Sequence, residues 1–439
     1  MESILATGSD GQLIPELDPK VYKNQASYVV SRTQTTTSSP IPVASSSGSG
    51  VRTVKFNIVD GNFIDLSTAT FSFNVNNRDT TGAAAVLTPL SAIPFCWFRR
   101  LVIKVNGAVV DDISELSRVE QQISMFLSTQ KKKNLGDMGT GWATGTDAGT
   151  DFFARSIPNN ASRRCTWRPL SSGFLQNGRY LPSMGGAAGG LSCELELSDA
   201  ADAVLNSTGL STNWDLTELK LHVDSVTLTS EITNDFADLL LSGRSILLPY
   251  SQNSCSVQYL AGTTGEVQVT LAKQFSRLST VFVSLAQDDP AAPSNDVAGA
   301  HTKTMNNFYL ADDQAEDVES YIQVNNRRWP SFSTQGTKHH MNRLMHALGS
   351  YNSSHASCIS ETGYGNGVAN NHSRQFVVGF DLETIPHRES TGMLVAGGGT
   401  VQISLKHTGT GGKAPSKAYI ITNSDAVLEL KDQSSIVYS

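Results

Sequence analysis

The chain has 439 residues, of which 40 are acidic and 33 are basic, so its formal net charge is −7. It lacks the basic balance of proteins that bind nucleic-acid phosphates, and no apolar run approaches the roughly 20 residues that cross a bilayer, so we expect neither strong direct nucleic-acid binding nor a transmembrane segment. Charged residues make up only 17%, while Gly, Ser, Thr and Asn are plentiful, which favours strands and turns over helices.

Residues 1–50 are predicted to form a partly disordered N-terminal arm rather than a domain. The start, Met1–Leu5, has neither the basic nor the apolar region of a secretory signal. Ile14–Val30 has enough apolar residues to pack on a partner, whereas Ser31–Gly50 is almost entirely Ser, Thr, Pro and Gly. We therefore expect this arm to grip a neighbouring protein.

Apolar and polar residues alternate along many short segments of the remaining chain. Phe71, Phe73 and Val75 alternate with polar residues, for example. The same period of two recurs in segments 54–58, 101–105, 193–197, 219–223, 267–271, 281–285, 401–405 and 419–421. Strict alternation buries one face of a strand and leaves the other in water, which is typical of antiparallel sandwiches.

Three segments are predicted to be helical. Leu116–Phe126 follows a capping box formed by Asp112 and Glu115, and Met341–Leu348 ends at Gly349. A third helix, near Thr233–Leu241, would join the two halves of the chain.

The chain contains two copies of one pattern, separated by about 210 residues, which predicts a duplicated domain rather than a short-period solenoid. Four pairs of segments occur in the same order in both halves. They are 66–73 with 278–285, 103–106 with 322–325, Gly173-Phe174 with Gly379-Phe380, and 189–197 with 398–405. The long turn-rich stretches Asn134–Asn160 and Asn352–His372 differ most between the copies, so we expect exposed binding loops there.

Several of these segments resemble the double-jelly-roll major capsid proteins of the lineage that includes adenovirus and tailless phages. The resemblance is carried by Phe98–Gly107, by Leu181–Leu197, and by Leu219–Leu228 followed by a helix and Ile246–Tyr250. Within that lineage the chain is most similar to the capsid proteins of virophages and polinton-like viruses.

The resemblance implies an all-β fold of two tandem jelly rolls, each with a short accessory helix, over residues 51–245 and 246–439. It also implies homotrimers that form pseudo-hexameric capsomers of an icosahedral shell around double-stranded DNA. The expected partners are neighbouring capsomers and minor capsid or penton proteins. The expected location is the virion, assembled inside the host cell.

No catalytic, cofactor or metal site is predicted. His339, His340 and His346 lie on one helix, with His355 and His372 beyond it, and we interpret them as surface or interface histidines rather than metal ligands, because H-E-x-x-H is absent. The glycine-rich segments 184–190 and 363–367 do not open a helix after a buried strand, so they predict turns rather than phosphate cradles.

The basic clusters and the cysteines are also interpreted as structural rather than as parts of a binding or catalytic site. Lys131–Lys133 would complement the dipole at the end of the first helix, with contacts to an inner layer as the alternative. Further basic pairs occur at residues 99–100, 163–164 and 327–328. Five scattered cysteines, without any C-x-x-C, favour a reducing compartment over a disulfide framework.

Two other functions compete with the capsid hypothesis. A carbohydrate-binding or adhesion protein built from tandem sandwiches would be favoured by a signal and disulfides, neither of which the sequence indicates. A two-jelly-roll enzyme such as a glycan amidase would need a convergent acidic or histidine pocket, which the sequence does not reveal.

Overall fold

The fold is taken from a computed structural model. It describes residues 29–41, 43–45, 52–58, 61–79, 85–91, 94–132, 156–183, 190–205, 210–260, 265–271, 273, 275–286, 308, 318–325, 327–348, 357–359, 364, 375–383, 392–395, 399–407, 415–431 and 434–438. Most of the predicted loops Asn134–Asn160 and Asn352–His372 lies outside the described residues, as do the glycine-rich segment 184–189, His355 and His372.

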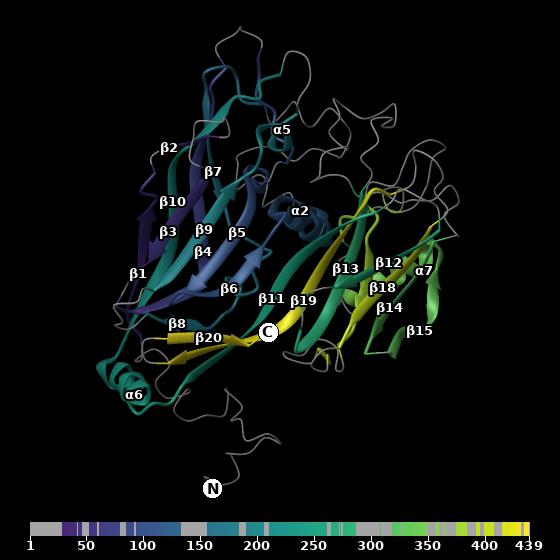
Figure 1. The fold of residues 1–439 in the computed structure, drawn as a ribbon. Coiled ribbons are helices and arrows are strands. Elements are labelled where there is room, and N and C mark those ends of the chain that lie inside the picture. Colours follow the sequence, from purple (N-terminus) through teal and green to yellow (C-terminus); the bar gives the residue numbers. More distant parts are fainter. Residues whose placement is uncertain are drawn as a thin grey trace.

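The first unit of the fold is a sandwich of two antiparallel sheets (Figure 1). A six-stranded sheet has the order β1-β10-β4-β7, with β2 on β10 and β8 on β4, and a four-stranded sheet has the order β3-β9-β5-β6. The strand bounds are β1 (Val29–Ser38), β2 (Val43–Ser45), β3 (Thr53–Ile58), β4 (Phe63–Asn77), β5 (Phe98–Val105), β6 (Ala108–Ile113), β7 (Ser162–Trp167), β8 (Tyr180–Pro182), β9 (Leu191–Leu197) and β10 (Trp214–Leu228). Burial alternates as the sequence predicts along β3 and β9, and in β9 every second residue from Leu191 to Leu197 is buried.

The second unit repeats this arrangement. Its six-stranded sheet has the order β11-β19-β13-β16, with β20 on β19 and β17 on β13, and its four-stranded sheet has the order β12-β18-β14-β15. The bounds are β11 (Ile246–Tyr259), β12 (Gly265–Leu271), β13 (Arg277–Ala286), β14 (Glu319–Val324), β15 (Arg327–Gln335), β16 (Val378–Asp381), β17 (Met393–Leu394), β18 (Val401–His407), β19 (Lys417–Lys431) and β20 (Ser434–Tyr438). In the first unit β1 lies beside β10 and β3 beside β9, and in the second unit β11 lies beside β19 and β12 beside β18, which is the jelly-roll order.

Three of the four segment pairs found in the sequence occupy equivalent strands. Residues 66–73 and 278–285 lie on β4 and β13, 103–106 and 322–325 on β5 and β14, and 191–197 and 401–405 on β9 and β18. The second pair marks a turn, because Asn106 and Asn325 both have a positive φ, of 48° and 49°. Each asparagine begins the two-residue loop of a hairpin. Asparagine is favoured in such loops because it tolerates the left-handed conformation.

The pairing of Gly173-Phe174 with Gly379-Phe380 is wrong. Gly379 and Phe380 lie on β16, whose equivalent in the first unit is β7, whereas Gly173 and Phe174 lie in a turn between β7 and β8. Both glycines approach another chain segment closely, Gly173 at Ser251 and Gly379 at Leu344, but the two dipeptides do not share a position in the fold.

Two stretches of the expected arm are strands of the first jelly roll, so the prediction of an arm through residue 50 is wrong for Val29–Ser38 and Val43–Ser45. β1 pairs with β10 from Val29 to Ser38, and β2 pairs with the start of the same strand. The Thr-rich composition of this segment suits a strand as well as a tether, because threonine is β-branched.

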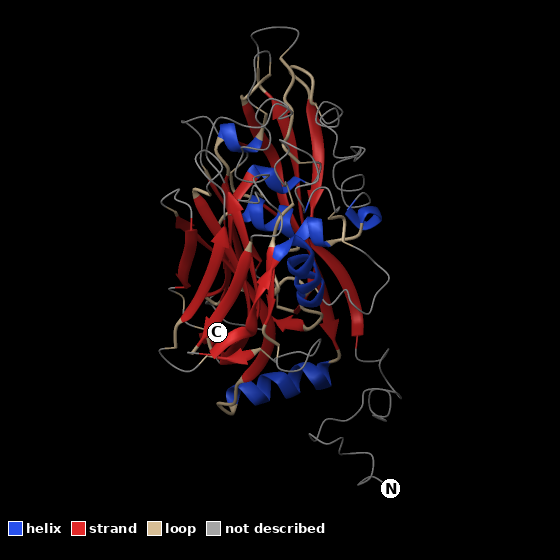
Figure 2. Cartoon of the chain, turned by 90° about the vertical axis from the view of Figure 1, so that its right-hand side faces the viewer, coloured by secondary structure: helices blue, strands red, loops and turns tan. Residues whose placement is uncertain are grey.

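The helices lie between or beside the sandwiches. α2 (Leu116–Phe126) follows β6, α7 (Gly336–Ala347) follows β15, and α6 (Ser230–Leu241) joins the two units at the lower end of the molecule in both views (Figures 1 and 2). The predicted capping box is absent, because Glu115 at the start of α2 has a left-handed backbone and makes no side-chain cap. None of the described helices is long and apolar enough to cross a membrane.

Candidate functional site

The two units meet along a continuous interface, which we call the seam. It joins β6, α2 and the 170–177 turn of the first unit to β11, β13 and β19 of the second. Buried residues of the second unit belong to the same apolar cluster as the core of the first, namely Leu248, Tyr250, Ile421, Ala426, Leu428 and Leu430. The chain is therefore one packed body rather than two domains on a linker.

The edge strand β11 covers the first unit by polar contacts to its backbone. The Tyr250 hydroxyl and the Gln252 amide both donate to the Val110 carbonyl on β6, at 2.9 Å and 2.6 Å. The Asn253 amide donates to the Ser171 carbonyl at 2.6 Å. Backbone acceptors that strand pairing leaves free in the first unit are thus satisfied by the second.

Gly173 is the point of closest approach across the seam. A Cβ atom at this position would lie 1.8 Å from the Ser251 carbonyl oxygen of β11. Only glycine allows the turn to seat against the strand at this distance. Beside it, the rings of Phe174 and Tyr250 pack edge to face with centroids 5.2 Å apart.

Two buried carboxyl groups hold the turn that carries Gly173. Glu120 on α2 accepts hydrogen bonds from the Leu170 and Ser171 backbone N–H groups and from the Ser171 hydroxyl. Asp111 on β6 accepts from the Ser172 hydroxyl at 2.6 Å and from the Phe174 N–H at 3.3 Å.

Burial raises the pKa of both carboxyls to about 7, although these hydrogen bonds oppose the rise. Lys273, the cation that most affects Asp111, opposes it too. Near neutral pH each group is thus poised between a neutral acid and a buried anion.

Helix α2 also inserts a cation into the second unit. The guanidinium of Arg118 is fully buried between the rings of Tyr419 and Phe308, 3.9 Å and 4.3 Å from their centroids, and donates to the Ser284 hydroxyl at 2.9 Å. Burial lowers its pKa to about 10, so it remains charged at neutral pH. A cation stacked between aromatic faces is stabilised by the ring quadrupoles.

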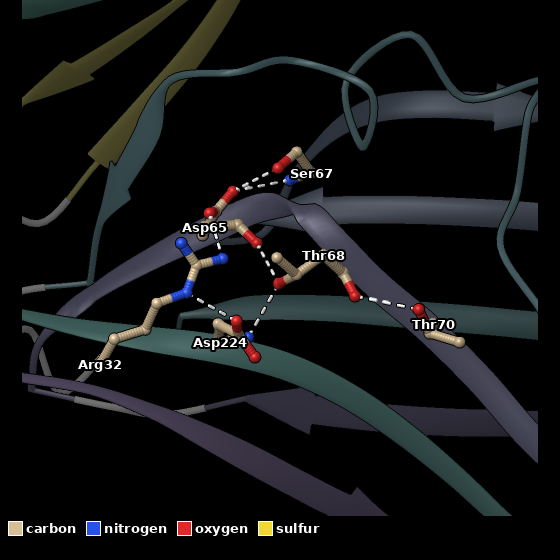
Figure 3. Close-up of polar contacts among 6 residues, drawn as sticks. All are labelled: Arg32, Asp65, Ser67, Thr68, Thr70 and Asp224. Atoms are coloured by element: carbon tan, nitrogen blue, oxygen red, sulfur yellow. Dashed lines mark hydrogen bonds and ion pairs between the residues drawn. The ribbon is translucent and has the colours of Figure 1, made fainter.

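A second polar cluster fastens β1 to its sheet (Figure 3). The Arg32 guanidinium lies between two carboxylates, with Nε 2.7 Å from Asp224 on β10 and a terminal nitrogen 2.9 Å from Asp65 on β4. Asp65 also accepts the Ser67 hydroxyl and N–H. One side chain on β1 thus links three neighbouring strands.

Solved structures similar to this chain are viral capsid proteins. The PBCV-1 protein VP54, fitted into a reconstruction of the virophage Sputnik, matches with a TM-score of 0.61 at 13% identity over 94% of this chain and 97% of that one. The Faustovirus major capsid protein matches at 0.57 and 9% identity, over 97% and 95%. The Sputnik virophage structure matches at 0.54 and 13% identity, over 93% and 88%. No protein-family model matches the sequence, and no curated protein is significantly similar to it.

The chain is a double jelly roll. The likeness runs from end to end in each pair of structures, so it includes the duplication and the order of the two units. It confirms the predicted all-β fold of tandem jelly rolls.

The histidines of the double jelly roll occupy different environments. His340 is buried, its Nδ1 donates to the Gly336 carbonyl at 2.6 Å, and its Nε2 therefore accepts from the Ser320 hydroxyl at 2.8 Å. Burial lowers its pKa to about 4, so it is a neutral core residue. His339 is exposed, and among the described residues no group of three or more His, Cys, Asp or Glu side chains could hold a metal ion.

The described residues of the basic clusters lie on strands or, for Lys131 and Lys132, in a short helical turn. Arg100 makes a bidentate ion pair with Asp112, at 2.8 Å and 2.7 Å. α2 ends at Phe126, and Lys131 and Lys132 lie in a separate helical turn over residues 129–132, so the predicted dipole contact with α2 is wrong; Lys133 lies outside the described residues. Arg328 stacks on Tyr321 with its guanidinium 3.9 Å from the ring centroid.

The sequence carries almost no signal of the seam. Asp111, Glu120 and Arg118 carried no motif, and their role depends on contacts with residues 50 to 300 positions away. In α2 the charged residues accompany the apolar stripe of Leu116, Val119 and Ile123, as in any amphipathic surface helix, so the sequence does not show that Arg118 and Glu120 are buried.

Proposed function

We propose that this protein is a major capsid protein whose homotrimers form pseudo-hexameric capsomers of an icosahedral shell around double-stranded DNA. Its site of action is then the capsid of the virion. Its partners are neighbouring capsomers and minor capsid or penton proteins.

The observation that carries the proposal is the end-to-end likeness to capsid proteins combined with the internal duplication. A chain of two similar units supplies six similar units when three copies assemble. Such a trimer suits a capsomer that has six neighbouring capsomers in the shell. The charge of −7 supports a role in which protein contacts, rather than phosphate contacts, dominate.

The test is the mass and morphology of the purified protein. Light scattering at micromolar concentration should give the mass of a trimer, and negative-stain micrographs should show hexagonal particles, followed by shells under assembly conditions. A stable monomer that binds immobilised glycans would instead support the carbohydrate-binding alternative and overturn the proposal.

A further inference from the structure

The seam inside one chain has a counterpart on each outer side of the molecule. Within the chain, β6 at the edge of the first unit packs against β11 at the edge of the second. β15 of the second unit is equivalent to β6, and β1 of the first unit is equivalent to β11, because they hold the same positions in their sheets. In Figure 1, β1 and β15 lie on opposite outer sides of the molecule.

The two equivalent edge strands, β1 and β11, differ in burial. Residues of β11 that point into the sandwich are covered by the first unit, so that Leu248, Tyr250 and Gln252 are only 7–8% exposed. Those of β1 that point inward pair with buried residues of β10, as Thr33 does with Ser225 and Thr35 with Val223. Thr33 is nevertheless exposed and Thr35 only half-buried.

Among the described residues, nothing covers the open side of the first sandwich as the first unit covers β11 of the second. The exposed residues are hydroxyl-bearing and β-branched, so they suit contact with a second chain's backbone as well as with water.

The strand β15 carries the matching feature. Near its turn, β6 is interrupted after Val109 by an irregularity that contains Val110, the residue whose carbonyl accepts Tyr250 and Gln252. β15 has a larger irregularity, one residue farther from its own turn, between Trp329 and Thr334. It presents Phe332, which is 86% exposed, more than any other large apolar side chain among the described residues.

We propose that β15 of one copy packs on β1 of the next, with Phe332 against Thr33 and Thr35, so that this contact between chains repeats the seam within each chain. The inference rests on the proposed function and specifies its subunit interface. The contact is head to tail, since it joins two different surfaces, and such a contact forms a closed ring when its rotation allows.

Cysteine cross-linking tests this pairing directly. Phe332→Cys combined with Thr33→Cys or with Thr35→Cys places thiols on the two surfaces, and the two threonine positions sample the strand register within the short reach of a disulfide. Under mild oxidation we expect covalent dimers and trimers on a denaturing gel, with no larger species. The single variants should give none, because a head-to-tail contact does not bring a residue against its own copy.

A matched control pair uses Leu394→Cys, which is 66% exposed on β17, with Thr33→Cys. The proposed interface would be overturned if light scattering showed trimers but neither test pair formed a cross-link. It would also be overturned if the single variants or the control pair formed cross-links. Either result would leave the proposed function standing. A monomeric wild-type protein would overturn both.

A charge at the same position gives a second measurement. Phe332→Asp should raise the concentration at which trimers dissociate at least tenfold, because it removes the ring that fills the contact and places a charge where the two chains exclude water. The Tm of the monomer should be unchanged, since the side chain is exposed within one chain. Leu394→Asp should leave the trimer unchanged, and an equal effect of both variants would contradict the inference.

Discussion

Individual residues at the seam combine burial with polar chemistry that only the folded chain satisfies. Oδ2 of Asp111 accepts two hydrogen bonds, while its Oδ1 has no hydrogen-bond partner among the residues that the structure describes. That arrangement favours a neutral acid, because an unpaired oxygen costs much more when it carries charge. Glu120 holds the adjoining residues of the same turn by three hydrogen bonds.

We predict that these carboxyls weaken the fold as pH rises. The folded pKa of Glu120 is about 7 and that of an unfolded glutamate is about 4, so the folded state holds a proton that the unfolded state loses between these values. The stabilisation is therefore complete below pH 4 and is lost as pH rises through 7. Glu120→Gln removes this dependence but buries an amide donor without a partner, which costs about 1–3 kcal/mol.

Chemical denaturation at pH 5.5 and pH 8 measures the effect. The variant should be less stable than wild type at pH 5.5, and the gap should shrink by roughly 2 kcal/mol at pH 8. The exposed Glu231→Gln should show no such change. A gap of constant size at both pH values would show that the Glu120 carboxyl does not titrate in this range.

Gly173→Ala should destabilise the protein by at least about 3 kcal/mol, because its Cβ would overlap the Ser251 carbonyl oxygen and force the turn away from β11. Gly178→Ala is the matched control, since a Cβ there meets nothing within 4 Å. Urea denaturation of the two variants separates the contact from the general effect of replacing glycine. Equal midpoints would mean that the turn does not bear on β11 in solution.

At the scale of elements, period-two patterning predicted most strands, because each sheet has one buried and one wet face. It failed for β1, whose residues are exposed on both faces apart from Thr35 and Thr37. A strand with no fully buried face does not need alternating apolar residues. The capping box failed for a related reason, since Asp112 pairs with Arg100 across the hairpin instead of capping α2. A local motif cannot reveal that a distant strand competes for its side chain.

Deletion of the N-terminal segment tests the revised boundary. Removal of residues 1–28 should leave a folded protein, whereas removal of residues 1–50 deletes β1 and β2 and exposes the hydrogen-bonding edge of β10. We expect the longer deletion to aggregate or to lose cooperative unfolding by circular dichroism. If both truncated proteins unfolded with the same Tm, β1 would contribute nothing to the sandwich.

At the scale of the whole molecule, the duplication was predictable because turn and strand signals recur in order. The packing between the copies was not. Leu248, Tyr250 and Leu428 look like ordinary strand residues of the second half, yet they belong to the apolar cluster of the first. Similar units with the same strand order can meet in many ways, and only the three-dimensional contact between β6 and β11 selects one.

The shared core predicts that neither unit is stable alone. Residues 246–439 expressed without the first unit would expose Leu248, Tyr250 and Leu430 and leave the Arg118 site between Tyr419 and Phe308 empty. Burying each large apolar side chain contributes about 1.5–3 kcal/mol, and the loss of several approaches the 5–15 kcal/mol that stabilises a typical domain. We therefore expect either fragment alone to aggregate, while coexpressed fragments 1–245 and 246–439 should copurify as a soluble complex. A single fragment that unfolds cooperatively at the midpoint of the full chain would show that the seam joins two independent domains.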